Sequence, residues 1–157
     1  MKKLEDKIHS LIDAKLIIEE WKKYDKKIVF TNGCFDIFHY GHLHLLNHSK
    51  QLGDKLVIGL NDDSSIKKLK GIERPIHNQN QRAFMLSSIS FVDLIILFSQ
   101  QTPMKIIKSI KPDVLTKGAD YSIDEVVGQK EVIRLGGRVT LIPLIKNLSS
   151  SSLIKDI

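Results

Sequence analysis

The sequence predicts an α/β fold, a doubly wound sheet of about five parallel strands. Two observations carry this prediction. Short β-branched runs alternate with amphipathic segments along most of the chain, and strands separated by helices imply crossover units and a parallel sheet. The runs LVIGL (56–60) and LIILF (94–98) are almost entirely apolar, which is typical of strands that helices cover on both faces. At 157 residues the chain is long enough for one such domain.

The expected elements can be placed in order along the chain. Residues 1–26 are expected to form one or two helices, with Asp13 as an N-cap, as an N-terminal helical extension of a main domain over residues 27–157. Strands are predicted at 28–31, 55–60, 92–98, 113–116 and 138–142. Helices are predicted at 41–52, 63–69, 79–89, 103–110, 123–135 and 149–157.

Composition narrows the class of protein. The single cysteine, Cys34, excludes an internal disulfide framework and fits a reducing cytoplasm. The N-terminus, MKKLEDKIHS, carries both charge signs and leads into no sustained apolar core, so no signal peptide is expected. The longest apolar stretch, 91–98, contains Asp93 and is too short to span a bilayer. A cytoplasmic protein without a membrane segment is therefore expected.

The net charge of +6 is distributed in a way that does not favour binding to nucleic acid. Lysines between residues 2 and 27 are interleaved with acidic residues, as on a solvated helix face. The one locally unbalanced cluster is Lys67, Lys68 and Lys70, near Arg74 and Arg82. A cluster of that size suits a phosphorylated small molecule better than a duplex.

The segment IVFTNGCFDIFHYGH, residues 28–42, carries the most chemical information. Its apolar start predicts a strand that delivers Thr31, Asn32 and Gly33 to the carboxyl edge of the sheet, where open α/β folds bind ligands. His39 and His42 share a helix face, and Gly41 between them keeps that face open. Two imidazoles beside the free N–H groups of a helix N-terminus suit a polyanion such as a nucleoside triphosphate.

From these residues alone, the two histidines have three interpretations. They are phosphate contacts, packing residues, or metal ligands that would need a partner such as His44 or His48 on the same segment.

Several segments together resemble one family. GCFDIFHYGH resembles the signature of the nucleotidyltransferase superfamily of the HxGH type, and within it the chain is most similar to heptose-phosphate adenylyltransferases. FTNGCFD, the stretch from Gly53 to Asp63, LKGIERPI, KGADY and GQKEVIRLGGRV support that branch. The resemblance covers the chain from about residue 26 to its end and implies a Rossmann-like fold.

The resemblance implies transfer of AMP from ATP to a heptose 1-phosphate, which gives ADP-heptose and pyrophosphate for bacterial surface polysaccharide such as lipopolysaccharide. Two alternatives stay open: a cytidylyltransferase that uses CTP and glycerol phosphate or another polyol phosphate, and a nucleotide-binding module without catalysis. Ser90 stands where the cytidylyltransferase branch usually has arginine, which favours the heptose branch.

The resemblance also implies roles for single residues. His39, His42 and Lys70 are expected to act in catalysis by contacting phosphates. Residues expected to bind or border the nucleotide are Thr31, Asn32, Gly33, Cys34, Phe35, Gly41, Arg82, Lys117, Gly118, Asp120, Ser149, Ser150 and Ser151. Two of these segments have simpler interpretations, because Asp120 can hold a turn and one serine can merely cap a helix.

Other charged residues near these motifs are not expected to contact the nucleotide. Asp36 either orients the turn or helps to hold a metal, and the structural role is favoured. Lys67, Lys68 and Arg74 fit a solvated face. The final motif departs from the family pattern, because Asn147 replaces glycine and serines replace threonines.

The resemblance further implies Mg²⁺, held mainly by the nucleotide phosphates and water and not by a protein ligand. A separate sugar kinase is expected to supply the acceptor, because this chain has no room for a kinase domain. The superfamily often dimerises, so a homodimer is among the assemblies that the resemblance allows.

Overall fold

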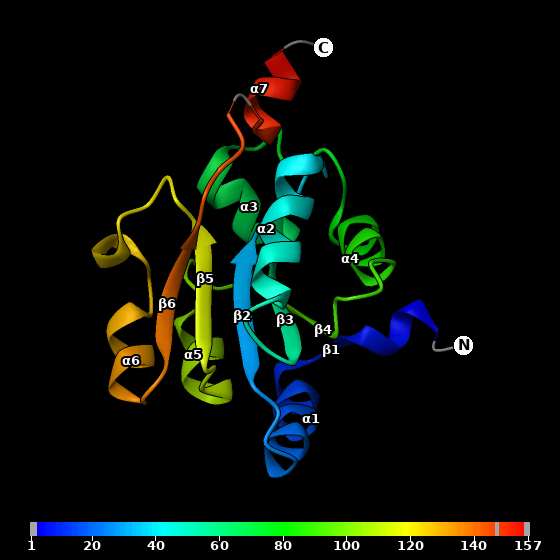
Figure 1. The fold of residues 1–157 in the computed structure, drawn as a ribbon. Coiled ribbons are helices and arrows are strands. Elements are labelled where there is room, and N and C mark those ends of the chain that lie inside the picture. The colour runs from blue at the N-terminus through cyan, green and yellow to red at the C-terminus, as the bar shows by residue number, and fades with distance from the viewer. Residues whose placement is uncertain (1–2, 147, 156–157) are drawn as a thin grey trace.

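The computed structural model describes residues 3–146 and 148–155, and these form one sheet of six parallel strands in the order β1-β4-β3-β2-β5-β6 (Figure 1). The predicted α/β class is confirmed, and each of the five predicted strands is present. The strands are β1 (Ile8–His9), β2 (Ile28–Gly33), β3 (Lys55–Asn61), β4 (Leu94–Phe98), β5 (Val114–Gly118) and β6 (Arg138–Ile142).

The α-helices follow the predicted order with one exception. They are α1 (Leu11–Lys23), α2 (Tyr40–Lys50), α3 (Asp63–Lys70), α4 (Gln79–Ser87), α5 (Met104–Ile110), α6 (Gln129–Arg134) and α7 (Ser150–Lys155). The predicted helix over 123–135 is wrong as one element, because a short 3-10 turn, η2 (Ile123–Glu125), precedes α6. Gly128 breaks the helix with a φ of 89°, and it lies against Ile107 with no room for a side chain.

The first 26 residues also differ from the expected helices. A 3-10 turn, η1 (Leu4–Lys7), leads into β1, which pairs with β4 at the edge of the sheet. The cap of α1 is Ser10 and not Asp13, because the Asp13 backbone N–H donates to Ser10 Oγ at 3.1 Å. A strand of two residues shows no alternation that a sequence pattern could reveal.

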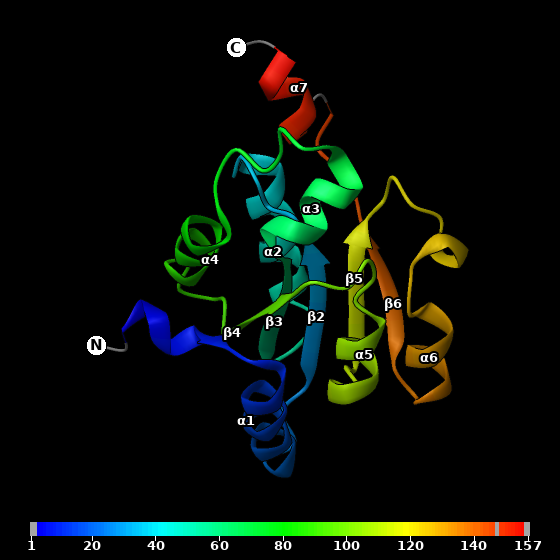
Figure 2. The same ribbon diagram turned by 180° about the vertical axis from the view of Figure 1, so that it is seen from behind.

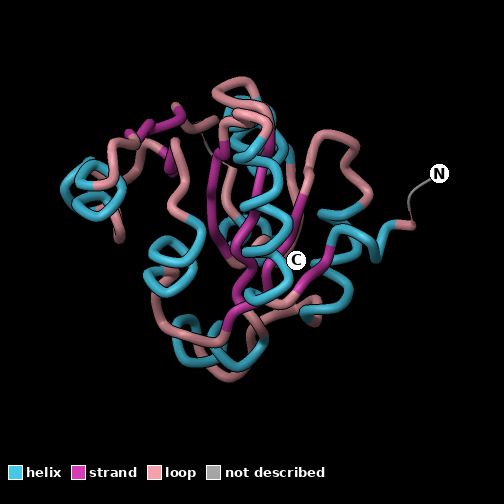
Figure 3. The backbone as a smooth tube through the Cα atoms, turned by 90° about the horizontal axis from the view of Figure 1, so that it is seen from below, coloured by secondary structure: helices cyan, strands magenta, loops and turns pink. Residues whose placement is uncertain are grey.

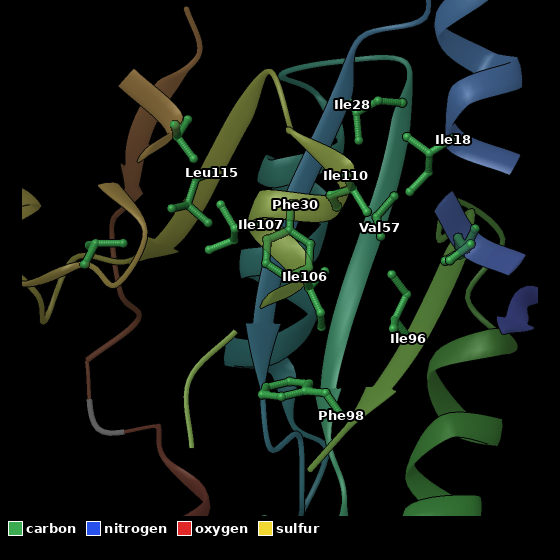
Figure 4. Packing of buried hydrophobic residues seen from close by; sticks show 14 residues of the cluster. Ile18, Ile28, Phe30, Val57, Ile96, Phe98, Ile106, Ile107, Ile110 and Leu115 are labelled. Atoms are coloured by element: carbon green, nitrogen blue, oxygen red, sulfur yellow. The ribbon is translucent and has the colours of Figure 1, made fainter. Parts of the chain in front are cut away.

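The sheet separates two apolar clusters. Ile28 and Phe30 of β2 point to the face that α1, α5 and α6 cover, where they pack with Ile18 and Ile107 (Figure 4). Val29 points to the opposite face and packs with residues of α2 and α4. α1, α5 and α6 can be followed in Figure 2, where the molecule is seen from behind. In Figure 3 the molecule is seen from below, with helices around the strands. No helix among the described residues has the length and apolar run that crossing a bilayer requires.

The position of β2 creates the crevice at the carboxyl edge. β2 lies between β3 and β5; α2 follows β2 on one face, and α6 follows β5 on the other. The loops after β2 and β5 therefore leave the sheet in opposite directions, which is the topological switch point where such sheets bind ligands.

Candidate active site

The carboxyl end of β2 brings the backbone of the first motif to this crevice. Thr31 is buried, and its Oγ1 donates to the backbone oxygen of Thr116 at 3.1 Å, so this side chain ties β2 to β5. The next residues are less buried. Phe35 adopts a φ of 46°, and its ring lies under Gly33, where an added Cβ would be 3.1 Å from Phe35 Cε2. Gly33 thus allows the tight turn that exposes the strand end.

His39 and His42 form a stacked pair at the start of α2. Their ring centroids are 3.8 Å apart with an angle of 23° between the planes. His39 occupies the N-cap, and its Nδ1 accepts the Gly41 backbone N–H at 3.0 Å; His42 Nδ1 accepts the His39 backbone N–H at 3.4 Å. A ring nitrogen that accepts a hydrogen bond carries no proton, so the neutral rings hold theirs on Nε2. Each histidine can then donate from Nε2 to a ligand.

Burial keeps both rings neutral. It lowers the pKa of His39, and it lowers the pKa of His42 to about 3, with the nearby His39 and Lys70 adding to the effect and Asp36 opposing it. Phe35 lies 5.1 Å and Phe38 5.5 Å from the His42 ring, centroid to centroid. At neutral pH the pair therefore offers hydrogen-bond donors without a buried positive charge.

A cavity of about 400 Å³ lies next to this turn. Five residues expected in the site line it: Asn32, Gly33, Cys34, Lys70 and Lys117. The other lining residues are Asn61, Leu69, Gln101, Thr102, Pro103, Tyr121, Glu125, Val126 and Val127. Residues such as Asn61, Gln101 and Thr102 were not predicted. Their signal in the sequence is position alone, because they end or follow the predicted strands at the carboxyl edge.

Lys117 is held in place at the floor of the cavity. Its ammonium donates to the backbone oxygen of Asn32 at 3.0 Å and lies 5.5 Å from the centroid of the Tyr121 ring. Burial lowers the pKa of Lys117, while Cys34 and Asp120 act in the opposite direction. Lys70, at the end of α3, is exposed on another wall.

Cys34, at the end of β2, lies near several cations. Burial raises its pKa, and four cations counteract that effect: Lys70, Arg82, Lys117 and Arg74. Cations from α3, the loop after it, α4 and β5 therefore lie around the point where β2 ends. The thiol itself is half-buried.

Arg82 lies inside the protein and binds protein oxygens, unlike an exposed arginine that is free to bind phosphate. It is fully buried, and its guanidinium donates to the backbone oxygens of Cys34, Asn61 and His77 and to Asp63 Oδ1, at 2.7 to 2.9 Å. These bonds fix the Cys34 carbonyl and the end of β3 relative to α4. A contact with phosphate stays a prediction for this residue.

Asp36 has the structural surroundings that were favoured for it. Its buried carboxylate accepts the backbone N–H groups of Ile76 and His77 at 2.9 to 3.0 Å and Arg74 Nε at 2.8 Å. Burial acts to raise the pKa of Asp36, but these hydrogen bonds and the Arg74 charge lower it overall. Arg74 is therefore ion-paired and largely buried, and the interpretation as part of a solvated face is wrong for it.

The two later motifs lie at the same edge: Lys117 and Tyr121 of KGADY line the cavity, whereas Gly118, Asp120 and the serines are outside its lining. An added Cβ on Gly118 would be 2.7 Å from Leu144 Cδ2, so this glycine allows close packing of the next loop, and Asp120 is exposed. Ser149 Oγ accepts the Ser152 backbone N–H at 3.0 Å, which is a helix cap, and Ser151 is exposed. Ser150 begins α7, and its side chain lies outside the described part of the chain.

The serine segment nevertheless approaches the histidine turn. An added Cβ on Gly41 would be 3.6 Å from Leu148 Cβ, which immediately precedes the serines. The structure thus places the first motif, the cavity and the last motif around one end of β2.

Comparisons with known proteins agree with this arrangement. A family profile described as cytidylyltransferase-like matches residues 30–157. Curated relatives named bifunctional protein HldE are 46% identical over 152 residues in Magnetococcus marinus and 50% identical over 154 residues in Helicobacter hepaticus. These matches cover 97% and 98% of this chain but only 31% of each relative, so the chain spans about a third of their length.

Solved structures show the same relationship. The lipopolysaccharide core biosynthesis protein from Thermoplasma volcanium is 36% identical with a TM-score of 0.64, and the match covers 78% of this chain and 99% of that one. Pantoate-beta-alanine ligase from Francisella tularensis shares the fold, with a TM-score of 0.68 at 15% identity over 96% of this chain and 72% of that one. The chain belongs to the cytidylyltransferase-like family and is a nucleotidyltransferase.

Proposed function

We propose that this chain transfers AMP from ATP to the phosphate of a heptose 1-phosphate, releasing pyrophosphate and forming ADP-heptose. The choice of heptose 1-phosphate as the acceptor rests on one observation: nearly the whole chain matches about a third of the bifunctional HldE proteins. We take that third to be their adenylyltransferase part. The name of the Thermoplasma volcanium relative, a lipopolysaccharide core biosynthesis protein, agrees with this acceptor. The geometry supports the reaction class, because donors and cations converge on one strand end.

In this reaction an oxygen of the sugar phosphate attacks the α-phosphorus of ATP. A new phosphorus–oxygen bond forms, the bond from the α-phosphorus to the bridging oxygen breaks, and pyrophosphate leaves with the bonding electrons. No covalent enzyme intermediate is needed, so the protein aligns the reactants and stabilises charge. We assign the second task to Nε2 of His39 and His42, whose hydrogen bonds strengthen as negative charge builds on the leaving group.

We assign the acceptor to the cavity. Lys117 supplies positive charge for the sugar phosphate, and the amides of Asn61 and Gln101 suit hydroxyl groups. The hydrogen bond from Lys117 to Asn32 fixes this ammonium beside the end of β2.

The donor set fits a magnesium ion that is carried by the substrate. The described residues contain no group of three or more histidine, cysteine or acidic side chains that could hold a metal, and the buried Asp36 carboxylate is already paired with Arg74. We therefore propose that phosphate oxygens and water hold Mg²⁺. When bound, it neutralises charge on the phosphates.

Further parts of the proposal concern the cellular setting. A sugar kinase activity must supply a phosphorylated acceptor of this kind, and we propose a cytoplasmic location, where ATP is available. A homodimer stays a prediction.

The decisive experiment is a matrix of nucleoside triphosphates against phosphorylated acceptors, with Mg²⁺ and pyrophosphate release as the readout. The proposal expects turnover with ATP and heptose 1-phosphate. Turnover with CTP and glycerol phosphate alone would overturn the acceptor and the nucleotide. ATP binding without turnover of any pair would indicate a binding module.

A further inference from the structure

Arg74 carries an unused hydrogen-bond donor inside the protein. It lies in the loop between α3 and α4, and its side chain is 12% exposed. Among the described residues, its Nη2 is the one buried side-chain nitrogen or oxygen that has no hydrogen-bond partner. Native proteins rarely leave such a group unpaired, and guanidinium groups pair readily with oxyanions, so this vacancy requires an explanation.

A role in attaching the loop between α3 and α4 does not explain why Nη2 is unpaired. Arg74 Nε already donates to Asp36 at 2.8 Å, and the same carboxylate accepts two backbone N–H groups of the loop, from Ile76 and His77. The loop is therefore attached to the turn after β2 without any contribution from Nη2. A lysine or glutamine could make one such bond, whereas the second donor is a property of the arginine fork.

The position of the unpaired donor follows from the shape of the guanidinium. Nη2 shares with Nε the edge of the planar group that meets Asp36, so it lies on the side of the Asp36 carboxylate, in the turn after β2. Asp36 and Lys70 both lie close enough to His42 to act on its pKa, and Arg74 acts in the same way on Cys34. The donor therefore belongs to the group of charges around the strand end.

We propose that Arg74 is a further phosphate-binding residue of the transfer site, oriented by Asp36 so that Nη2 donates to an oxygen of the nucleotide triphosphate. This role rests on the proposed function. An anion is the fitting occupant because Arg74 and the two neutral histidines offer hydrogen-bond donors, Lys70 adds positive charge near His42, and the Asp36 carboxylate is already paired. A triphosphate has enough oxygens to use all of them.

The test measures affinity for ATP and for inorganic pyrophosphate by calorimetry, together with the KM for each substrate. Arg74→Ala should weaken binding of both ligands by about 10- to 100-fold, the range for hydrogen bonds to charged groups. The KM for heptose 1-phosphate should stay unchanged. Arg74→Lys keeps a cation near Asp36 but loses the fork, so it should melt close to the wild-type temperature and still bind ATP weakly.

Arg134→Ala is the matched control, because Arg134 is an exposed arginine that pairs with Glu131 on α6. It should bind ATP like the wild type. Folded Arg74→Ala with a lower melting temperature and wild-type affinity for ATP and pyrophosphate would overturn the proposal and leave Arg74 a loop anchor. If Arg74→Ala does not fold, wild-type affinity in Arg74→Lys overturns it. A wild-type chain that binds neither ligand would overturn the proposed function as well.

Discussion

Helix α2 carries two histidine pairs that look alike and differ in what they can do. His39 and His42 stack at 3.8 Å at the first turn, and His44 and His48 lie 4.0 Å apart further along the same helix. In the first pair both Nδ1 atoms accept backbone N–H groups. In the second pair His44 Nε2 and His48 Nδ1 lie within hydrogen-bond distance of backbone oxygens, those of Pro143 and His44.

The difference lies in the part of the helix to which each pair is attached. The first turn of a helix has free N–H groups, and these bind Nδ1 of both rings in the first pair, which leaves each Nε2 as a donor. The middle of a helix has no free N–H groups. The rings of the second pair therefore donate hydrogen bonds to nearby backbone oxygens. Residue type and ring stacking therefore do not distinguish the two pairs, whereas their position relative to the helix end does.

The largest expected effect separates the two pairs by activity. His39→Ala or His42→Ala should lower kcat by about 100- to 1,000-fold, the usual cost of removing one donor that acts on transition-state charge. Affinity for ATP should fall much less, because the contact strengthens during the reaction. Steady-state pyrophosphate release and ATP calorimetry measure the two quantities. His44→Ala and His48→Ala are the controls and should keep wild-type kcat. Equal losses of kcat and ATP affinity at His39 or His42 would contradict the transition-state role.

A smaller effect concerns stability as a function of pH. The pKa of His42 is about 3 in the folded chain against an ordinary value of 6.5, so between these values the unfolded chain binds a proton that the folded chain excludes. The contribution of His42 is complete above pH 6.5 and is lost as the pH falls toward 3, by at most about 1.4 kcal/mol per pH unit.

Denaturant unfolding at several pH values between 4 and 7 measures this dependence. His42→Asn should show a shallower loss of stability than the wild type in that window. Asn47→Ala, on the same helix, should keep the wild-type slope. Identical slopes in wild type and His42→Asn would show that His42 is not kept neutral by the fold.

The smallest effect tests the space between the first two histidines. A Cβ on Gly41 would lie 2.9 Å from His39 Cε1 and 3.0 Å from Nδ1, so Gly41→Ala must displace the ring. We expect kcat to fall about 10-fold through misplacement of the donor. The free energy of unfolding should not fall, because alanine is the better helix former. Wild-type kcat in Gly41→Ala would mean that the ring position is not critical, and Asn47→Ala again serves as the control.

Much of the fold could be predicted because its long strands are apolar on both faces. LVIGL and LIILF gave their strands correct places within a residue or two. β1 could not be found, because two residues carry no period and their pairing with β4 depends on a contact far away in the sequence. The break at Gly128 depends on its packing against Ile107, which is also a tertiary effect.

The candidate site was predictable in part. The histidine pair and the turn before it follow from local spacing, and the family that they suggest is confirmed. The roles of the cations do not follow from spacing. A sequence cannot show that Arg82 meets three backbone oxygens, or that Arg74 is folded onto Asp36, because these partners come from other loops. Most single-residue roles in the site stay predictions until the substitutions are measured.

The strand order has a consequence for how such a domain can change during evolution. The histidine turn comes from the loop after β2, whereas several walls of the cavity come from α3 and from the loops after β4 and β5. Substitutions in those walls can alter the size and polarity of the cavity without touching the residues that orient the imidazoles. One framework can therefore keep its phosphate chemistry while its second substrate is exchanged, which is the pattern that a superfamily of diverse transferases requires.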